Sequence, residues 1–417
     1  MARKSREDNG AKGAEAAQQM LSARRRIFGG DRVLWVIFTA LVVVSILVVY
    51  SSTAKMAYDI SSRFTTTQSL RQQIMLVLLC IPVIVLVHKV DWKLFYRLTP
   101  LLYWVFVGLT LLTYFIGTST NDAARWIAIG SIQFQPSEGL KVMTILMLAR
   151  RMSSRQGNIN KINIMPTSIH ITDPRQMRIL KENTLPLLGP VFLSCGVVVT
   201  AHTSSAILIF IASLIMLYIG RVRVRELVKF TVFTCLVGVL LLSVLRIGRA
   251  DVAGGRLSTW VKEWTSSETP RTSYAMSDTQ RAMIAIREGG LFGEGAGHST
   301  TRALVTHPES DYAYAFFVSE YGLVIALILM MLYLWVFFRS IEIFRACRTP
   351  FPALMTLGLG LLITCQALLH IMVQVNLIPE TGQTLPLISR GGSSLLFTTL
   401  ALGMILSVSR ANSLDEA

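Results

Sequence analysis

The sequence predicts an all-α integral membrane protein with ten transmembrane helices. Apolar residues make up 52% of the chain and charged residues only 15%, whereas soluble domains carry about 25% charged residues. The chain contains repeated apolar runs that are each about 20 residues long. A helix of this length crosses a bilayer core of about 30 Å. The net charge of +16 comes from basic residues between these runs. Such residues orient a membrane protein, so no nucleic-acid partner is expected.

One polytopic domain is expected over residues 31–410. Residues 1–30 are polar and end in Arg24-Arg25-Arg26, which predicts a disordered basic cytoplasmic tail without a cleavable signal peptide. Residues 411–417 form a short cytoplasmic C-terminal tail. The expected spans lie near 33–51, 72–90, 99–117, 136–152, 184–201, 203–220, 227–246, 311–338, 352–378 and 389–409.

The distribution of Lys and Arg predicts the orientation. Basic loops alternate with loops poorer in charge, and an even number of spans with both termini cytoplasmic satisfies this alternation. The loops at 118–135, 247–310 and 379–388 then face outside. The long 247–310 loop also carries arginines, but long loops translocate regardless of charge. The junction of the fifth and sixth spans at 200–203 is expected to be a tight turn or a re-entrant break.

A charged pair lies inside the fourth expected span. Pro136 suits the first turn of a helix, where its missing N–H costs nothing. Glu138 and Lys141 follow three residues apart, on one helical face. Each charge near mid-membrane costs about 2.5–3.5 kcal/mol, so the pair is expected to face the protein interior. It either locks helices together as an ion pair or lines a substrate cavity, with Gln135 and Ser137 beside it.

Two further residues of interest precede this span on its outer side. Arg125 and Trp126 lie together in the segment 121–127. A tryptophan at such a position is typical of the interfacial belt of a membrane protein. The alternative is a binding role, in which the planar fork of the arginine pairs with a phosphate and the indole stacks on a sugar or a lipid.

Glycines and carboxylates precede the eighth expected span. Gly289–Gly297 lacks a complete dinucleotide-binding pattern and follows no βαβ unit, so it predicts a close backbone turn against the membrane. Glu309 and Asp311 flank the start of the span. An aspartate there is a favoured helix cap, and the alternative is a catalytic general base. A third alternative joins His307 to both carboxylates as ligands of a hard divalent cation.

The last expected outer loop leads into the tenth span. Pro379 and Pro386 predict a rigid loop, and the span opens with Ser389 and then Gly391-Gly392-Ser393-Ser394. Small residues let backbones approach closely, and N–H groups at a helix start can bind anions. Polar residues of the ninth span are expected to face inward: His370, Gln374 and Asn376.

Taken together, these motifs resemble the SEDS family of polytopic glycosyltransferases in bacterial cell-wall synthesis. The resemblance runs from about residue 31 to residue 410. Five motifs carry it, in order and at matching membrane positions: Ala124–Ile127, Gln135–Glu138 with Lys141, Ile284–Gly293, Pro308–Tyr312, and Leu385–Ser389 with Gly391–Ser394.

The resemblance implies polymerisation of lipid II, the undecaprenyl-pyrophosphate-linked disaccharide pentapeptide, into a nascent glycan strand at the outer face of the bacterial plasma (inner) membrane. The family's catalytic aspartate aligns with Asp311, which is expected to act as general base in an inverting transfer. No cofactor is clearly implied, and a divalent cation, Mg²⁺ or Mn²⁺, stays open as a helper for the pyrophosphate. Residues expected to contact the substrate are Arg125, Trp126, Gln135, Ser137, Glu138, Lys141, Gln280, Glu309, Ser389, Gly391, Gly392, Ser393 and Ser394.

Three places depart from the family pattern. Ser310 stands directly before Asp311, where the family has His-Thr. The fifth-to-sixth junction reads Ala201–Ser205, where the family commonly has Gln-Pro-Asp-x-Gly-Thr. Arg390 stands where a tyrosine or a small residue is more usual. The Asp311 assignment survives these departures, but the roles of its neighbours stay open.

Within the family, the starts Gly30–Trp35 and Val49–Thr53 and the extended N-terminus are similar to division-type (FtsW) members. This similarity implies a septal location with a class B penicillin-binding transpeptidase and divisome proteins as partners. An elongation-type (RodA) polymerase is the alternative. Two other classes also stay open. A lipid II flippase would need a charged central cavity, and a non-enzymatic divisome scaffold would leave the polar residues replaceable.

Overall fold

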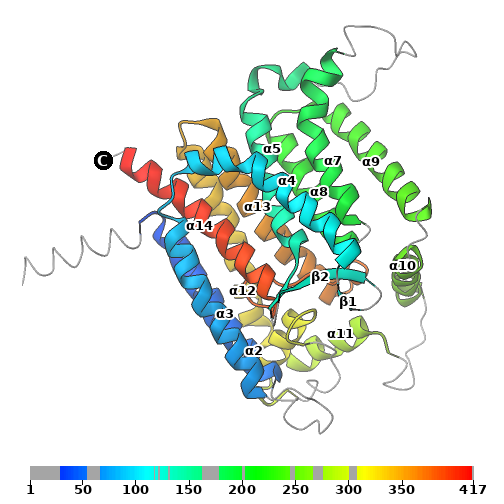
Figure 1. Ribbon diagram of the computed structural model, residues 1–417. Coiled ribbons are helices and arrows are strands. Elements are labelled where there is room, and N and C mark those ends of the chain that lie inside the picture. The colour runs from blue at the N-terminus through cyan, green and yellow to red at the C-terminus, as the bar shows by residue number, and fades with distance from the viewer. Residues whose placement is uncertain are drawn as a thin grey trace, which may run out of the picture.

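The computed structural model describes residues 29–53, 66–116, 118–120, 123–129, 132–161, 178–199, 202–244, 249–265, 276–299 and 308–415. Over these residues the chain forms a helical bundle with one small sheet at one end (Figure 1).

Ten helices of the described chain lie where the ten spans are predicted. They are α2 (Arg32–Thr53), α3 (Thr66–Val87), α4 (Trp92–Ile116), α5 (Pro136–Ser153), α7 (Leu185–Val199), α8 (Thr203–Ile219), α9 (Val224–Val244), α12 (Ala313–Ala346), α13 (Pro350–Gln374) and α14 (Gly392–Asp415).

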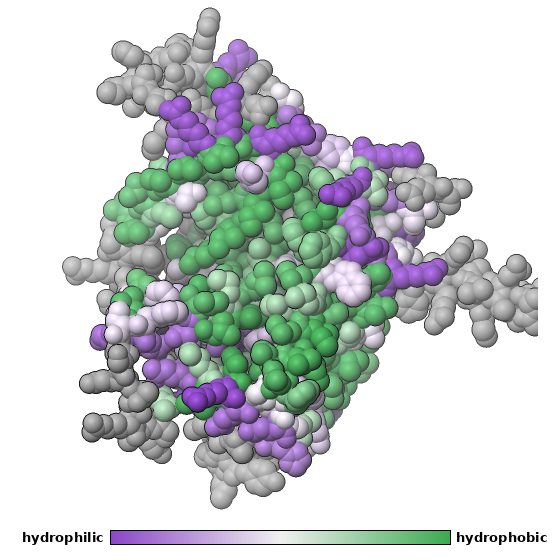
Figure 2. Space-filling model, turned by 180° about the vertical axis from the view of Figure 1, so that it is seen from behind, coloured by the Kyte–Doolittle hydropathy of each residue, from purple (hydrophilic) through white to green (hydrophobic). Residues whose placement is uncertain are grey.

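Seven of these helices are long and apolar enough to cross a membrane, and α5, α8 and α9 do not meet that test. Helix α8 is apolar but has only 17 residues, while α5 carries acidic and basic side chains at both of its ends. Seen from behind, the surface shows a broad apolar area, with hydrophilic residues gathered towards its upper and lower ends (Figure 2). The chain is therefore a multi-pass membrane protein.

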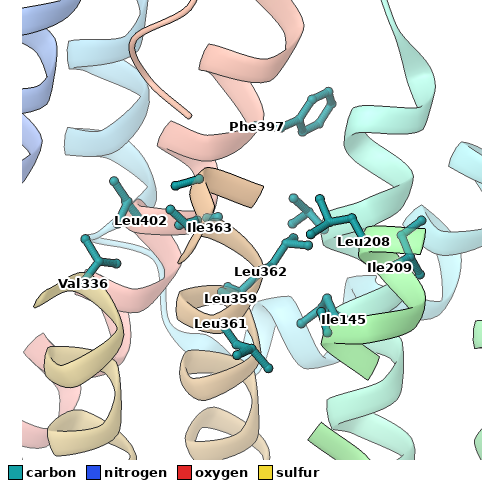
Figure 3. Close-up of a cluster of buried hydrophobic side chains, with 14 of the residues drawn as sticks. Ile145, Leu208, Ile209, Val336, Leu359, Leu361, Leu362, Ile363, Phe397 and Leu402 are labelled. Atoms are coloured by element: carbon teal, nitrogen blue, oxygen red, sulfur yellow. The ribbon is translucent and has the colours of Figure 1, made fainter. Parts of the chain in front are cut away.

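The centre of the bundle is formed by α5, α13 and α14. Both α13 and α14 have 78% of their span buried inside the protein. Figure 3 shows apolar side chains of this core, among them Ile145 of α5, Leu362 of α13 and Phe397 of α14. At Gly358 of α13 an added Cβ would lie 2.7 Å from Ile145 Cγ2. Only a glycine therefore lets α13 approach α5 so closely.

A small antiparallel sheet interrupts the helical pattern between α4 and α5. Strands β1 (Thr118–Thr120), β2 (Ala123–Ile129) and β3 (Ile132–Phe134) pair in the order β1-β2-β3. The all-α prediction did not include this sheet. Strand β2 contains β-branched and aromatic residues, which favour strands. It is only 7 residues long, so its strand pattern is weaker than the helical pattern of the long apolar runs on either side.

The segment 247–310, expected as a loop, contains two helices. They are α10 (Arg249–Thr265) and α11 (Asp278–Gly289). Helix α11 begins with a capping box, in which the Ser277 side chain accepts from the Gln280 N–H and the Gln280 side chain accepts from the Ser277 N–H, each at 3.1 Å. Such reciprocal bonds satisfy two donors at a helix start.

The predicted glycine turn packs into a break of α12. Gly322 interrupts α12 with φ 82° and ψ 167°, a conformation essentially confined to glycine. The turn restores the backbone bonds lost at the break. Glu294 N donates to Ser319 O at 3.0 Å, and Leu323 N donates to Gly290 O at 3.0 Å. A Cβ on Gly322 would lie 2.4 Å from Leu291 O. The expected close backbone turn is confirmed, with α12 as its partner.

Candidate active site

The Asp311 turn is held through three successive backbone carbonyls, two by the loop between α13 and α14 and one by the last residue of α13. Glu309 O accepts from Arg390 N at 2.7 Å, and Ser310 O accepts from Ser389 Oγ at 2.7 Å. Asp311 O accepts from Gln374 Nε2 at 2.6 Å. Residues about 60 to 80 positions apart in the chain therefore fix the backbone of the turn.

Asp311 does not occupy the cap position that one sequence interpretation gave it. The N-cap of α12 is Tyr312, one residue later, and the Asp311 side chain is half-buried in the turn before it. The position still lies at the positive end of the α12 dipole, which favours a carboxylate. Glu309, two residues earlier, is buried at 7% exposure.

A second carboxyl, Glu380, lies close to Asp311 in the loop after α13. Burial raises its pKa, and the negative charges of Asp278 and Asp311 raise it further. Arg256 of α10 and the Tyr312 hydroxyl lower it in part. The same loop passes over Asp311, because a Cβ on Gly382 would lie 4.0 Å from Asp311 Oδ2. Like charges therefore gather at the N-terminal end of α12.

The Glu138–Lys141 pair predicted on α5 is confirmed as a buried ion pair. Lys141 Nζ lies 2.8 Å from Glu138 Oε1, and the two side chains are 2% and 9% exposed. Lys141 Nζ also donates to Gln366 Oε1 at 3.0 Å and to Gln383 Oε1 at 3.5 Å. Three acceptors match the three N–H donors of a lysine. The arrangement favours the helix-locking role over the cavity-lining role.

Gln383 connects this ion pair to the divergent junction before α8. Its Nε2 donates to Ser205 Oγ at 2.9 Å and lies 3.3 Å from His202 Nδ1. His202, at the N-cap of α8, is buried at 7% exposure. In this chain the junction thus supplies a histidine and serines to the polar interior, where the family pattern has an aspartate.

A continuous polar path leads from the ion pair to the Asp311 turn. Gln383 O lies 2.7 Å from His370 Nδ1, and His370 Nε2 lies 3.3 Å from Gln374 Nε2. Gln374 then holds Asp311 O, while its Oε1 accepts from Ala315 N at 3.1 Å. The prediction that His370, Gln374 and Asn376 face inward is confirmed, since they are 2%, 0% and 8% exposed.

The small residues at the head of α14 join α5 to this path. Ser393 Oγ accepts from Gln135 N at 2.9 Å, and Ser394 Oγ accepts from Thr384 Oγ1 at 2.8 Å. A Cβ on Gly391 or Gly392 would come no closer than 3.4 Å to its neighbours. Close helix approach therefore does not explain these two glycines.

The other expected substrate contacts have varied surroundings. Ser137 is buried at the start of α5, and Trp126 is half-buried in β2. Gln280 uses its side-chain oxygen in the capping box of α11. The Arg125 side chain, Asn121, Asp122 and His307 lie outside what the structure describes.

A metal site is not formed by the residues described. Among them no group of three or more His, Cys, Asp or Glu side chains could hold a metal ion. The expected ligand His307 is not one of the described residues, so the divalent-cation hypothesis stays a prediction.

Sequence reasoning missed Gln366, which accepts from Lys141 and donates from its Nε2 to Thr384 O at 3.0 Å. A glutamine inside an apolar run is the signal that could have found it, because an amide at membrane depth needs partners.

Comparisons with known proteins identify the family of the chain. The family model described as "Cell cycle protein", which covers FtsW, RodA and SpoVE, matches residues 31–414. Stage V sporulation protein E of Bacillus subtilis is 26% identical over 91% of this chain and 97% of its own length. A probable peptidoglycan glycosyltransferase FtsW of Coxiella burnetii is 30% identical over 70% of this chain and 73% of its own length.

Two solved structures share the fold. A chain of a peptidoglycan synthase complex superposes with a TM-score of 0.64 at 20% identity, over 92% of this chain and 98% of that chain. The rod shape determining protein RodA of Thermus thermophilus superposes with a TM-score of 0.57 at 22% identity, over 92% of this chain and 97% of that chain. The chain therefore belongs to the FtsW/RodA/SpoVE family of membrane proteins, the SEDS family.

Proposed function

We propose that the protein is a peptidoglycan glycosyltransferase that polymerises lipid II at the outer face of the plasma membrane. The observation that carries this proposal is the Asp311 turn, whose three successive carbonyls are held by the end of α13 and the loop that follows it. A carboxylate in a turn whose backbone is fixed elsewhere meets the geometric demand on a general base. A relative with 30% identity bears the name of a probable peptidoglycan glycosyltransferase.

In the proposed reaction Asp311 takes the proton of the acceptor sugar hydroxyl. The hydroxyl oxygen then forms a bond to the anomeric carbon of the donor sugar. The bond between that carbon and the pyrophosphate oxygen breaks, and undecaprenyl pyrophosphate leaves with the electron pair. Attack from the face opposite the leaving group inverts the anomeric centre. Arg125 is proposed to bind the pyrophosphate through its planar fork, and no step is written through a metal ion.

The proposed topology has ten spans, with both termini cytoplasmic and the segment 247–310 outside. It adds α5, α8 and α9 to the seven helices that pass the length and composition test. Two observations support it. Helices α5 and α8 pack in the core of the bundle. Basic residues lie in the last turn of α5, at Arg150 and Arg151, and directly after α8, at Arg221 and Arg223. Such residues favour the cytoplasmic side.

A role in division is proposed over a role in elongation, with a class B penicillin-binding transpeptidase and divisome proteins as partners at the septum. The support comes from relatives named FtsW, such as the one in Coxiella burnetii, and from the similarity of the first span to division-type members. The full coordination of Lys141 by three acceptors disfavours a flippase, which would need this charge to be free to move.

The experiment is glycan polymerisation from lipid II by the purified full-length protein, alone and with a co-purified transpeptidase. Asp311→Asn keeps the size of the side chain but removes its basicity. Glu342→Gln is the matched control, because Glu342 lies on the same helix α12, is exposed, and pairs with Arg339. Polymer from wild type and Glu342→Gln but not from Asp311→Asn supports the proposal. Equal polymer from all three refutes the role of Asp311, and none from wild type refutes the activity.

A further inference from the structure

The half-buried side chains in the described part of helix α10 form one narrow stripe. Arg256, Trp260 and Glu263 are half-buried, and they recur at helical spacing. The residue directly after each of them is exposed and apolar: Leu257, Val261 and Trp264 are 52%, 45% and 61% exposed. Successive helical residues are about 100° apart. The exposed apolar stripe therefore lies about a quarter-turn away from the half-buried stripe of Arg256, Trp260 and Glu263.

The next position around the helix is polar. Ser258, Lys262 and Thr265 follow the apolar stripe by one more residue and are exposed. Helix α10 thus presents three faces in order: one against the protein, one apolar and one hydrophilic. Figure 1 views α10 almost along its axis, whereas the helices of the bundle run across the picture, so α10 lies crosswise to the bundle. An amphipathic helix in this orientation fits the plane of a membrane surface.

Helix α10 packs against Asn376, which lies just after the end of α13. The indole N–H groups of Trp260 and Trp264 both donate to Asn376 O, at 3.1 Å and 3.0 Å. Asn376 Nδ2 donates to Glu263 Oε2 at 3.1 Å. The polar part of Trp264 is therefore satisfied inside the protein, while its ring stays exposed beside Leu257 and Val261. An indole held in this way suits the boundary between acyl chains and headgroups.

Asn376 also lies two residues after Gln374, the side chain that holds Asp311 O. It adopts a positive φ of 56°, which is uncommon outside glycine and which asparagine tolerates. A contact that fixes the position of α10 relative to the membrane surface therefore also acts on the segment from Gln374 to Asn376, which holds the Asp311 turn.

We propose that α10 is an interfacial helix whose Leu257–Val261–Trp264 stripe lies in the acyl–headgroup boundary of the membrane, and that it holds the Asp311 turn at headgroup depth through Asn376 and Gln374. The occupant of the stripe is lipid, because the helix lies crosswise to the bundle, its exposed apolar stripe runs beside an exposed polar one, and the indole N–H of Trp264 is already bonded. The second half of this proposal rests on the proposed function, and the first half does not.

Nitroxide accessibility tests the first half. Leu257→Cys, Val261→Cys, Ser258→Cys and Lys262→Cys are labelled one at a time in the full chain, with the five native cysteines replaced, in nanodiscs of phosphatidylethanolamine and phosphatidylglycerol. Labels at 257 and 261 should favour oxygen over a water-soluble nickel chelate by several-fold, and labels at 258 and 262 should show the reverse. Equal access of the chelate to all four positions overturns the proposal, as does occlusion of 257 and 261 from both reagents, which indicates a protein partner.

A second measurement avoids the cysteine replacements. The fluorescence difference between wild type and Trp264→Phe reports Trp264 alone. Lipids brominated near the glycerol end of the acyl chain should quench this difference strongly, and lipids brominated near the chain end should quench it weakly. The absence of quenching by either lipid contradicts an interfacial position.

Polymerisation in the same nanodiscs tests the coupling to Asp311. The pair Leu257→Glu with Val261→Glu should lower the rate several-fold, while the matched pair Ser258→Glu with Thr259→Glu should leave it near wild type. If accessibility places the stripe in lipid but both pairs polymerise like wild type, the anchor stands and the coupling is refuted. If the wild-type protein does not polymerise lipid II, the proposed function is refuted, and the interfacial position of α10 is still decided by the accessibility measurement.

Discussion

The protein holds charge in two regions that are built in opposite ways. In the bundle core, Glu138 and Lys141 form a buried ion pair in which the lysine has three acceptors. At the N-terminal end of α12, Asp311 is half-buried. Its negative charge and that of Asp278 act on Glu380, and Arg256 compensates them there in part. The first region balances its charges, whereas the second gathers carboxylates.

The difference separates a structural role from a chemical one. A balanced buried pair resists change, because the loss of one partner strands the other in a low-dielectric interior. A half-buried carboxylate in a turn whose backbone is held by other segments is the arrangement that we propose for a general base. The polar path through Gln383, His370 and Gln374 joins the two regions, so the buried ion pair is connected to the backbone around Asp311.

The largest effect on stability is expected at the balanced region. Lys141→Met leaves Glu138 buried without its cation, and breaking a buried pair in this way costs about 3–5 kcal/mol. Thermal unfolding of the detergent-purified protein measures the loss. The double variant Glu138→Gln with Lys141→Met should recover much of it, because no lone charge remains. A Lys141→Met protein as stable as wild type would contradict the structural role.

A somewhat smaller loss is expected at the break of α12. Gly322→Ala forces a side chain into a conformation reserved for glycine and places a Cβ 2.4 Å from Leu291 O. Backbone strain and overpacking together should cost about 2–4 kcal/mol. The matched control is Gly108→Ala in α4, where no atom lies within 4 Å of the new Cβ. Equal unfolding temperatures for the two variants would show that the break is not needed.

Removing one of the hydrogen bonds that hold the Asp311 turn should cause a smaller loss of stability. Gln374→Met loses the bond to Asp311 O and the bond from Ala315 N, and unsatisfied buried backbone groups cost about 1–3 kcal/mol. The polymerisation rate per folded molecule should also fall, because the backbone of the Asp311 turn is then held less firmly. Gln72→Met, which loses only an exposed bond from Arg390, is the control. An unchanged rate for Gln374→Met would refute the positioning role.

The smallest effect is a pH dependence at Glu380. Burial raises the pKa of this carboxyl above its ordinary value of 4.5, so the folded protein binds the proton more tightly than the unfolded chain. Stability is then lost as pH rises from 4.5 through the raised pKa. Glu380→Gln should therefore increase the unfolding temperature at pH 7 and change it little at pH 4. A gain at pH 4 that equals the gain at pH 7 would contradict the burial of a titrating carboxyl.

The sequence was sufficient to predict the helices, whereas the role of Asp311 as general base stays a prediction. Apolar runs of membrane length located ten helices, and the spacing of Glu138 and Lys141 placed both on one inward face. The turn at 289–297 was also predicted, because glycines with positive φ leave a clear signal. These features depend on local residues, which a single sequence displays.

Features that depend on distant residues could not be predicted. Gln366 and Gln383 become partners of Lys141 only when α5, α13 and the following loop meet. The break at Gly322 lies in an unbroken apolar run, and its cause is the turn about 30 residues earlier. The three carbonyl bonds of the Asp311 turn join segments that no periodicity connects.

The most direct test of the central claim compares Asp311→Asn and Lys141→Met in two measurements on the same preparations, the unfolding temperature and the rate of lipid II polymerisation per folded molecule. For Asp311→Asn we predict a rate lower by about 10²–10⁴-fold, as for the loss of a general base, with an unfolding temperature close to wild type. For Lys141→Met we predict a large drop in unfolding temperature. An Asp311→Asn protein that polymerises at the wild-type rate would contradict the account.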